Sequence, residues 1–113
     1  MLASFHYSSH IEEFAADYIL VKRIYPKVVV AMIVREFPKA TGLDVVFALA
    51  SIAESVRLWL PKDQFEKDLP LKLFEVCAML GSDLFAMEKL GIYPATCRAI
   101  EAYWGEEEGY FKL

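Results

Sequence analysis

Few residues of this 113-residue chain have types and spacings suited to chemistry. His6 and His10 stand four positions apart with Glu13 three further on, and on one helix such residues share a face that could bind a metal ion. However, Ser9 and Glu12 have the spacing of a helix capping box, which would place His6 outside the helix. We therefore expect no metal ion and no cofactor at this segment.

The same segment carries three acids, Glu12, Glu13 and Asp17. Carboxyl groups that share a pocket shift each other's pKa and can act as general acid and base. Acids at a helix start also complement its positive end, and we favour this interpretation. The sequence contains no nucleophile elbow, P-loop, dinucleotide-binding or zinc-protease motif. The sequence therefore favours a protein that is not an enzyme.

The two cysteines, Cys77 and Cys97, stand far apart and form no CxxC motif, so we expect reduced thiols buried on apolar helix faces. The N-terminus has neither the basic region nor the apolar region of a signal peptide. The longest apolar run, residues 28–34, is much shorter than the roughly 20 residues that span a bilayer. These features predict a cytoplasmic protein without a membrane span.

The acidic composition argues against a protein that binds nucleic acids. The formal net charge is −4 and the pI is about 5.1, whereas binding to phosphate backbones requires a basic face. Hydrophobic residues make up 57% of the chain, more than is usual for a soluble globular domain. Residues 1–113 are therefore expected to form a single domain that either has a large core or covers apolar surface with a partner.

The segment from Thr41 to Leu60 is predicted to be the central helix. Thr41 and Asp44 have the spacing of a capping box, and Pro61 ends the helix near Leu60. The segment has a narrow polar edge, so we expect it to touch neighbours on more than one side. One face is formed by residues that recur at spacings of three and four: Val45, Leu49, Ile52, Val56 and Trp59.

Two helices are expected before the central helix. The first runs from Ser9 to about Tyr25, with a buried stripe of Ile11, Phe14, Tyr18, Val21 and Tyr25. Residues 26–37 are ambiguous, because their β-branched side chains favour a strand. Pro26 at a first helical position, the stop at Pro38 and the lack of a partner strand favour a helix, which is our prediction.

After Pro61 the pattern remains helical but interrupted. Asp63 and Glu66 form another capping box, and Pro70 is expected to break the chain direction. An apolar stripe then continues to Leu90, with an interruption at Gly81, and Gly91 ends it. A last helix is predicted from Pro94 to Trp104. The fold class is thus all-α, a compact bundle of about five helices packed around residues 41–60.

Residues 83–103, DLFAMEKLGIYPATCRAIEAY, resemble a helix-turn-helix unit in outline. Gly91 occupies the turn, and Tyr93 and Arg98 would face a DNA groove. Met87, however, stands where such units usually carry Ala, and the acids 106–108 would repel phosphates. Binding to DNA is therefore the second hypothesis, behind an ordinary helical hairpin.

The leading hypothesis is a small, acidic, non-enzymatic helical module for protein interaction or regulation. It would act through an apolar helix face, as a homo-oligomer or with a protein partner. A third hypothesis is a bundle that binds a metal or a small ligand, with a pocket among Met32, Met79 and Met87. Positive charges also gather around the corners at Pro26 and Pro38, where they could receive an acidic segment. The candidate interface residues are Val28, Val29, Met32, Tyr103, Trp104 and Phe111.

Overall fold

A computed structural model describes residues 2–106 of the chain, and side chains from Tyr7 to Gly105. Within these residues the chain forms five α-helices and one π-helical stretch, and no strand is present. The prediction of an all-α fold of about five helices is confirmed. In chain order the elements are α1 (Leu2–Ala16), η1 (Asp17–Val21), α2 (Pro26–Glu36), α3 (Gly42–Val56), α4 (Gln64–Lys89) and α5 (Cys97–Glu106).

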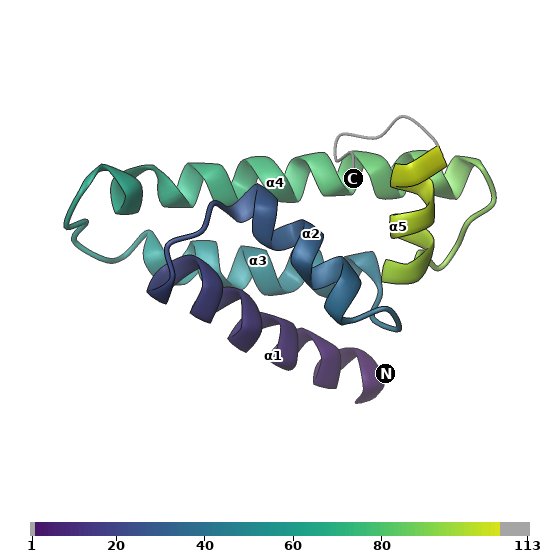
Figure 1. The fold of residues 1–113 in the computed structure, drawn as a ribbon, viewed down its shortest axis with the longest axis horizontal. Coiled ribbons are helices and arrows are strands. Elements are labelled where there is room, and N and C mark those ends of the chain that lie inside the picture. Colours follow the sequence, from purple (N-terminus) through teal and green to yellow (C-terminus); the bar gives the residue numbers. More distant parts are fainter. Residues whose placement is uncertain (1, 107–113) are drawn as a thin grey trace.

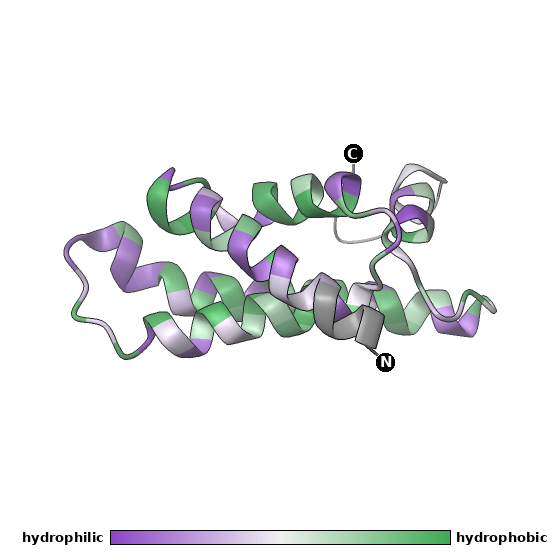
Figure 2. Ribbon diagram, turned by 90° about the horizontal axis from the view of Figure 1, so that it is seen from below, coloured by the Kyte–Doolittle hydropathy of each residue, from purple (hydrophilic) through white to green (hydrophobic). Residues whose placement is uncertain are grey.

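The long α4 and the shorter α3 form an antiparallel hairpin (Figure 1). α1 packs on α3, and α2 crosses in front of the hairpin, so both helices lie on one side of it (Figures 1 and 2). α5 stands at one end of α4 and packs against α2. Among the described elements, this arrangement covers one side of the α3–α4 hairpin and leaves the other side toward solvent (Figures 1 and 2). None of the described helices combines the length and apolarity that a membrane crossing requires.

α3 is the central helix that the sequence predicts. Its capping box is formed, because the Asp44 amide donates to Thr41 Oγ1 over 3.2 Å and the Thr41 amide donates to Asp44 Oδ2 over 2.9 Å. Ser8 of α1 donates to the other Asp44 oxygen over 3.3 Å, which joins the two helices at this point. The predicted face is buried over four residues: Val45, Leu49, Ile52 and Val56.

The predicted end of this helix at Leu60 is wrong, because α3 ends at Val56. The following amides make tighter bonds, from Leu58 to the Ser55 carbonyl and from Trp59 to the Val56 carbonyl. Trp59 is half exposed and Leu60 is 92% exposed, so neither extends the buried face. The side chains beyond Val56 are exposed, so burial does not support another helical turn there, and propensity alone does not maintain one.

The first helix begins at Leu2, so the predicted start at Ser9 is wrong and Ser9 lies inside α1. The helix widens into η1, where the Lys22 amide donates to the Asp17 carbonyl over 3.0 Å. A π-helical turn contains one more residue than an α-turn and rotates the residues after it. Consequently Val21, expected in the buried stripe, is exposed. Tyr25, also expected there, lies beyond the helix as the cap of α2 and is exposed as well. The buried residues are Ile11, Ala15 and Ile19.

The helical prediction for residues 26–37 is confirmed by α2, which has Pro26 at its first position. Proline is favoured there because the first amides of a helix lack an intrahelical partner in any case. Most of its β-branched side chains pack inward as part of the core instead of forming a ladder, whereas Val28 is exposed. The buried residues of α2 are Pro26, Val29, Val30, Ile33 and Val34.

The predicted interruptions at Pro70 and Gly81 are wrong, because α4 runs unbroken through both. Pro70 removes one amide from the helix, but the flanking core residues Leu69 and Leu73 are buried and support this stretch. The cap at Asp63 is formed, since its side chain accepts from the Glu66 amide over 3.0 Å. Glu66 in return accepts from the Lys62 amide rather than from that of Asp63.

α4 ends as expected before Gly91, which has the positive φ of 87° that glycine tolerates. α5 begins at Cys97 rather than at Pro94, because Thr96 acts as its cap and accepts from the Ala99 amide over 3.2 Å. The start of α5 is also tied to the loop before α3, where the Cys97 amide donates to the Ala40 carbonyl over 2.7 Å.

Candidate functional site

The side of the α3–α4 hairpin that faces away from α1 and α2 carries a continuous set of apolar residues, which we call the outer face. On α4 these residues follow one another at intervals of three and four positions, so they share a side of the helix. The core-facing residues of α4, such as Leu73 and Leu80, lie on its opposite side. The outer face comprises Leu43, Phe47, Leu71, Phe74, Ala78, Gly81 and Phe85.

These side chains are exposed to an unusual degree. Phe47 is 60% exposed, Phe85 is 64% exposed and Phe74 is 45% exposed. Single exposed apolar residues are common on proteins, whereas a contiguous patch of aromatic and aliphatic side chains marks an interaction surface.

The relative position of the two helices joins these residues into one surface. The Cys77 thiol of α4 lies 3.8 Å from the Val46 carbonyl of α3. Because the helices are antiparallel, the later residues of α4 lie beside the start of α3. There they border a groove of about 500 Å³, lined by Thr41, Leu43, Val46, Gly81, Leu84, Phe85, Glu88, Ile92, Tyr93, Pro94 and Ala95.

Two glycines border this region and differ in what they permit. A Cβ at Gly42 would lie 2.4 Å from Leu84 Cδ2, so Gly42 is required for the close packing of α3 and α4. A Cβ at Gly81 would meet no atom within 4 Å. Gly81 therefore opens the groove without supporting any packing inside the chain.

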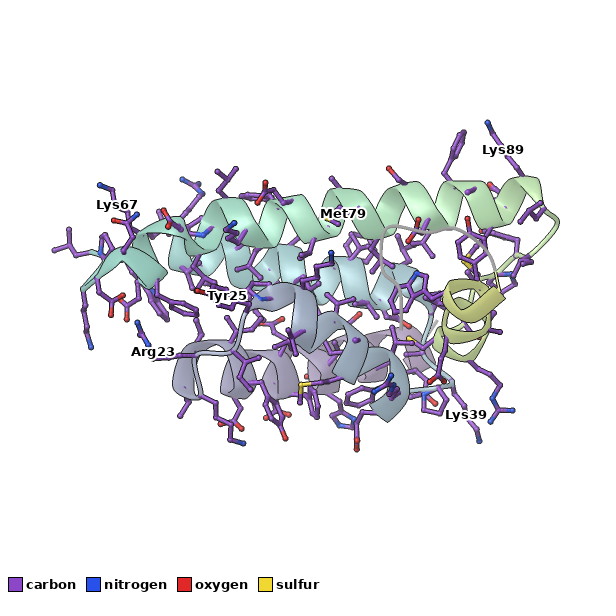
Figure 3. All side chains as sticks on the ribbon, turned by 45° about the horizontal axis from the view of Figure 1, so that its top comes forward. Arg23, Tyr25, Lys39, Lys67, Met79 and Lys89 are labelled. Atoms are coloured by element: carbon purple, nitrogen blue, oxygen red, sulfur yellow. The ribbon has the colours of Figure 1, made fainter. Side chains whose placement is uncertain are left out.

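Charged groups lie toward the ends of the outer face rather than at its centre. The Lys89 ammonium sits 4.7 Å from the centre of the Phe85 ring. Lys67 and Lys89 mark opposite ends of α4 (Figure 3). On α3, Glu54 and Arg57 form an ion pair with an N–O distance of 2.6 Å. An apolar centre with charges at the rim is the composition of a protein–protein interface.

The predicted interface residues lie in environments that differ in burial. Val29, Tyr103 and Trp104 lie in the core, while Val28 is exposed and Met32 is half-buried on α2. Phe111 lies outside the described residues. The three core residues therefore pack within the chain, while Val28 and Met32 lie four positions apart on one side of α2.

The residues of the outer face escaped the sequence analysis for an identifiable reason. The expected breaks at Pro70 and Gly81 divided α4 into pieces, which hid the stripe that runs from Leu71 to Phe85. The signal was nevertheless present as a second helical period, offset from the core stripe of the same helix.

A second hollow of about 360 Å³ lies between the start of α2 and the middle of α4. Tyr25 and Met79 border it (Figure 3). Met87 is instead buried in the core, so it does not join Met79 in a pocket of the kind predicted. The charged residues around this hollow have mixed signs: Lys27, Lys72 and Glu75.

His6 and His10 are the two residues that the sequence suggests as possible metal ligands. His10 is exposed on α1, and the side chain of His6 lies outside those described. Among the described residues, no group of three or more His, Cys, Asp or Glu side chains could hold a metal ion.

The basic residues near the Pro26 and Pro38 corners largely pair within the chain. Arg23 contacts the carboxyl groups of Asp63 and Glu66, and its hydrogen bond lowers the pKa of Asp63. Two further ion pairs join Lys22 to Asp17 over 3.0 Å and Arg35 to Glu101 over 3.5 Å. Arg23 and Arg35 therefore connect separate elements of the fold, whereas the Lys22 pair is local to η1.

Tyr93 and Arg98, the DNA-binding candidates, are both exposed. The helix that carries Arg98 packs on α2 rather than mainly on α4, unlike the second helix of a helix-turn-helix unit. The outward residues around Arg98 include Glu101 and Ala102, so the described part of α5 presents no basic face.

No family model matches the chain, and no curated protein or solved structure is similar enough to indicate a family or a function.

Proposed function

We propose that the chain is a protein-interaction module whose binding surface is the outer face of the α3–α4 hairpin. One observation carries the proposal: Phe47, Phe74 and Phe85 are all exposed on the α3–α4 hairpin. The helices α1 and α2 cover only one side of that hairpin (Figures 1 and 2). Covering such side chains removes apolar area from water, which is the main driving force of association.

The shape of the surface favours a helical partner over a small ligand. The outer face follows two antiparallel helices, and its groove is open and lined mainly by apolar side chains, with Glu88 as the charged residue. Small-ligand sites instead enclose their ligand and place several polar groups around it. A partner helix that lies along the hairpin would place apolar side chains between those of α3 and α4.

Site-specific photo-crosslinking tests this proposal. We expect a benzophenone amino acid at position 47 to crosslink to a protein, either a second copy or another chain from the native host. The control carries the same group in place of Val21, which is 72% exposed on η1 but lies outside the outer face. Crosslinking from position 47 should also decrease strongly when Phe85→Glu is introduced.

Phe85→Glu changes an exposed side chain, so the free energy of unfolding should change by only about 0.5 kcal/mol. A loss of crosslinking in this variant would thus report on the surface and not on unfolding. Equal crosslinking from positions 21 and 47, or none from either, would contradict the proposal.

A further inference from the structure

The proposed interaction surface has an internal symmetry, and the inference drawn from it rests on the proposed function. Phe74 and Gly81 lie at equal distances along α4 from the point midway between residues 77 and 78. Lys67 and Glu88 also lie at equal distances from this point. All four residues lie on the side of α4 that carries the outer face, as the helical period requires.

We propose that a second copy of the chain covers the outer face, with the two α4 helices antiparallel about a twofold axis near Ala78. In this register Phe74 of each copy enters the groove beside Gly81 of the other. Lys67 of each copy faces Glu88 of the other. A twofold axis repeats each contact, so both pairs form twice.

The side chains at the contact are complementary in shape. Phe74 projects as a 45% exposed ring, and Gly81 provides an opening in which a Cβ would meet no atom within 4 Å. The groove beside Gly81, about 500 Å³ in volume, is bordered by Val46, Leu84 and Phe85. An aromatic side chain that enters such an opening has the geometry by which helices interlock.

The available area is sufficient for a dimer of modest affinity. From Lys67 to Glu88, α4 extends about 30 Å at 1.5 Å per residue. With α3 beside it at a typical interaxial distance, the hairpin is about 20 Å wide, so a copy could bury about 600 Å². Two copies would bury about 1,200 Å², at the lower limit for specific interfaces. We therefore expect a concentration-dependent dimer.

The charges at the two ends determine the register. Lys67 and Glu88 have opposite signs, so the antiparallel arrangement brings attractive pairs together at both ends. A parallel arrangement would instead place each residue beside its own copy, with like charges together. The charge pattern thus favours antiparallel pairing.

Sedimentation velocity of the full chain over a range of concentrations tests the proposal. We expect the mass to rise from one copy, 12.9 kDa, to two. Gly81→Leu should fill the groove and keep the chain monomeric. The fold should tolerate this change, because the position has open space and leucine favours a helix over glycine. Thermal unfolding at low concentration checks that the fold is intact.

A charge exchange tests the register. Lys67→Glu should weaken dimerisation roughly tenfold, because two attractive pairs become repulsive. Adding Glu88→Lys should restore it. The control combines Lys67→Glu with Glu75→Lys, which has the same net charge but places the new lysine off the outer face, and it should not restore dimerisation.

The outcomes separate this inference from the proposed function. A dimer that persists in Gly81→Leu, or that the control exchange rescues equally well, would overturn the register. A monomer at all concentrations that still crosslinks from position 47 to a different protein would overturn the dimer and leave the proposed function intact. A monomer that crosslinks to nothing would overturn both.

Discussion

Removing the hydrogen bond between Trp104 and Asp83 is expected to destabilise the fold measurably. Trp104 Nε1 of α5 donates to Asp83 Oδ2 of α4 over 3.0 Å, and the two residues are 3% and 4% exposed. Trp104→Phe keeps an aromatic ring in the core but deprives the buried carboxyl group of this donor. Removing one partner of a buried hydrogen bond costs about 1–3 kcal/mol, and the smaller ring adds a packing loss. We expect a total loss of about 2–4 kcal/mol.

The hydrogen-bond contribution can be separated from the packing loss by a double-mutant cycle. Asp83→Leu removes the acceptor, and the double variant removes both partners. Because a missing partner costs more than replacing both by apolar groups, the two substitutions should not be additive, with a coupling of about 1–2 kcal/mol. Urea denaturation followed by circular dichroism supplies the four free energies of unfolding.

The chain provides a matched control in its second tryptophan. Trp59 lies in the loop after α3 and is 50% exposed, so Trp59→Phe should change the free energy of unfolding by about 0.5 kcal/mol or less. If Trp104→Phe cost no more than Trp59→Phe, or if the coupling with Asp83→Leu fell below about 0.5 kcal/mol, the bond would not stabilise the attachment of α5.

Two other perturbations test the core. Leu49→Ala should lower the free energy of unfolding by about 2–5 kcal/mol, because Leu49 is fully buried. Phe47→Ala, two positions away on the outer face, should lower it by about 1 kcal/mol or less. The midpoints of urea denaturation measure both changes. Burial, followed by the charge of Asp44, raises the pKa of the Cys97 thiol to about 12. The thiol ionises first in the unfolded chain, so stability should fall as the pH rises above about 9, and this fall should be shallower in Cys97→Ala. An equally steep fall in both proteins would contradict this assignment.

The elements that the sequence predicts correctly are those with local physical causes. The start of α3 follows from Thr41 and Asp44, whose side chains satisfy each other's backbone amides whatever the rest of the chain does. The helical state of α2 follows from Pro26 and from the absence of a partner strand. The core face of α3 follows from spacing alone, since residues three and four apart share one side of a helix.

The boundaries that the sequence misses depend on neighbours distant in the chain. Pro70 lies within α4 because the packing of the buried residues around it stabilises the helix. Local helix propensity does not include this packing energy. α3 ends at Val56, and the side chains after it are exposed, so the burial that stabilises the helix stops there. The π-helical stretch after Ala16 rotates Val21 outward, and an amphipathic period does not predict such a rotation.

The candidate site was decided almost wholly by the tertiary structure. Sequence composition indicated excess apolar residues, but hydrophobicity does not distinguish a core side chain from an interface side chain. Val29 and Trp104 became core because α2 and α5 pack inward, and Phe47 and Phe85 became surface because α1 and α2 cover only one side of the hairpin. Which apolar face remains uncovered depends on how the helices are placed in space, and the sequence encodes that placement only through the sum of many weak contacts.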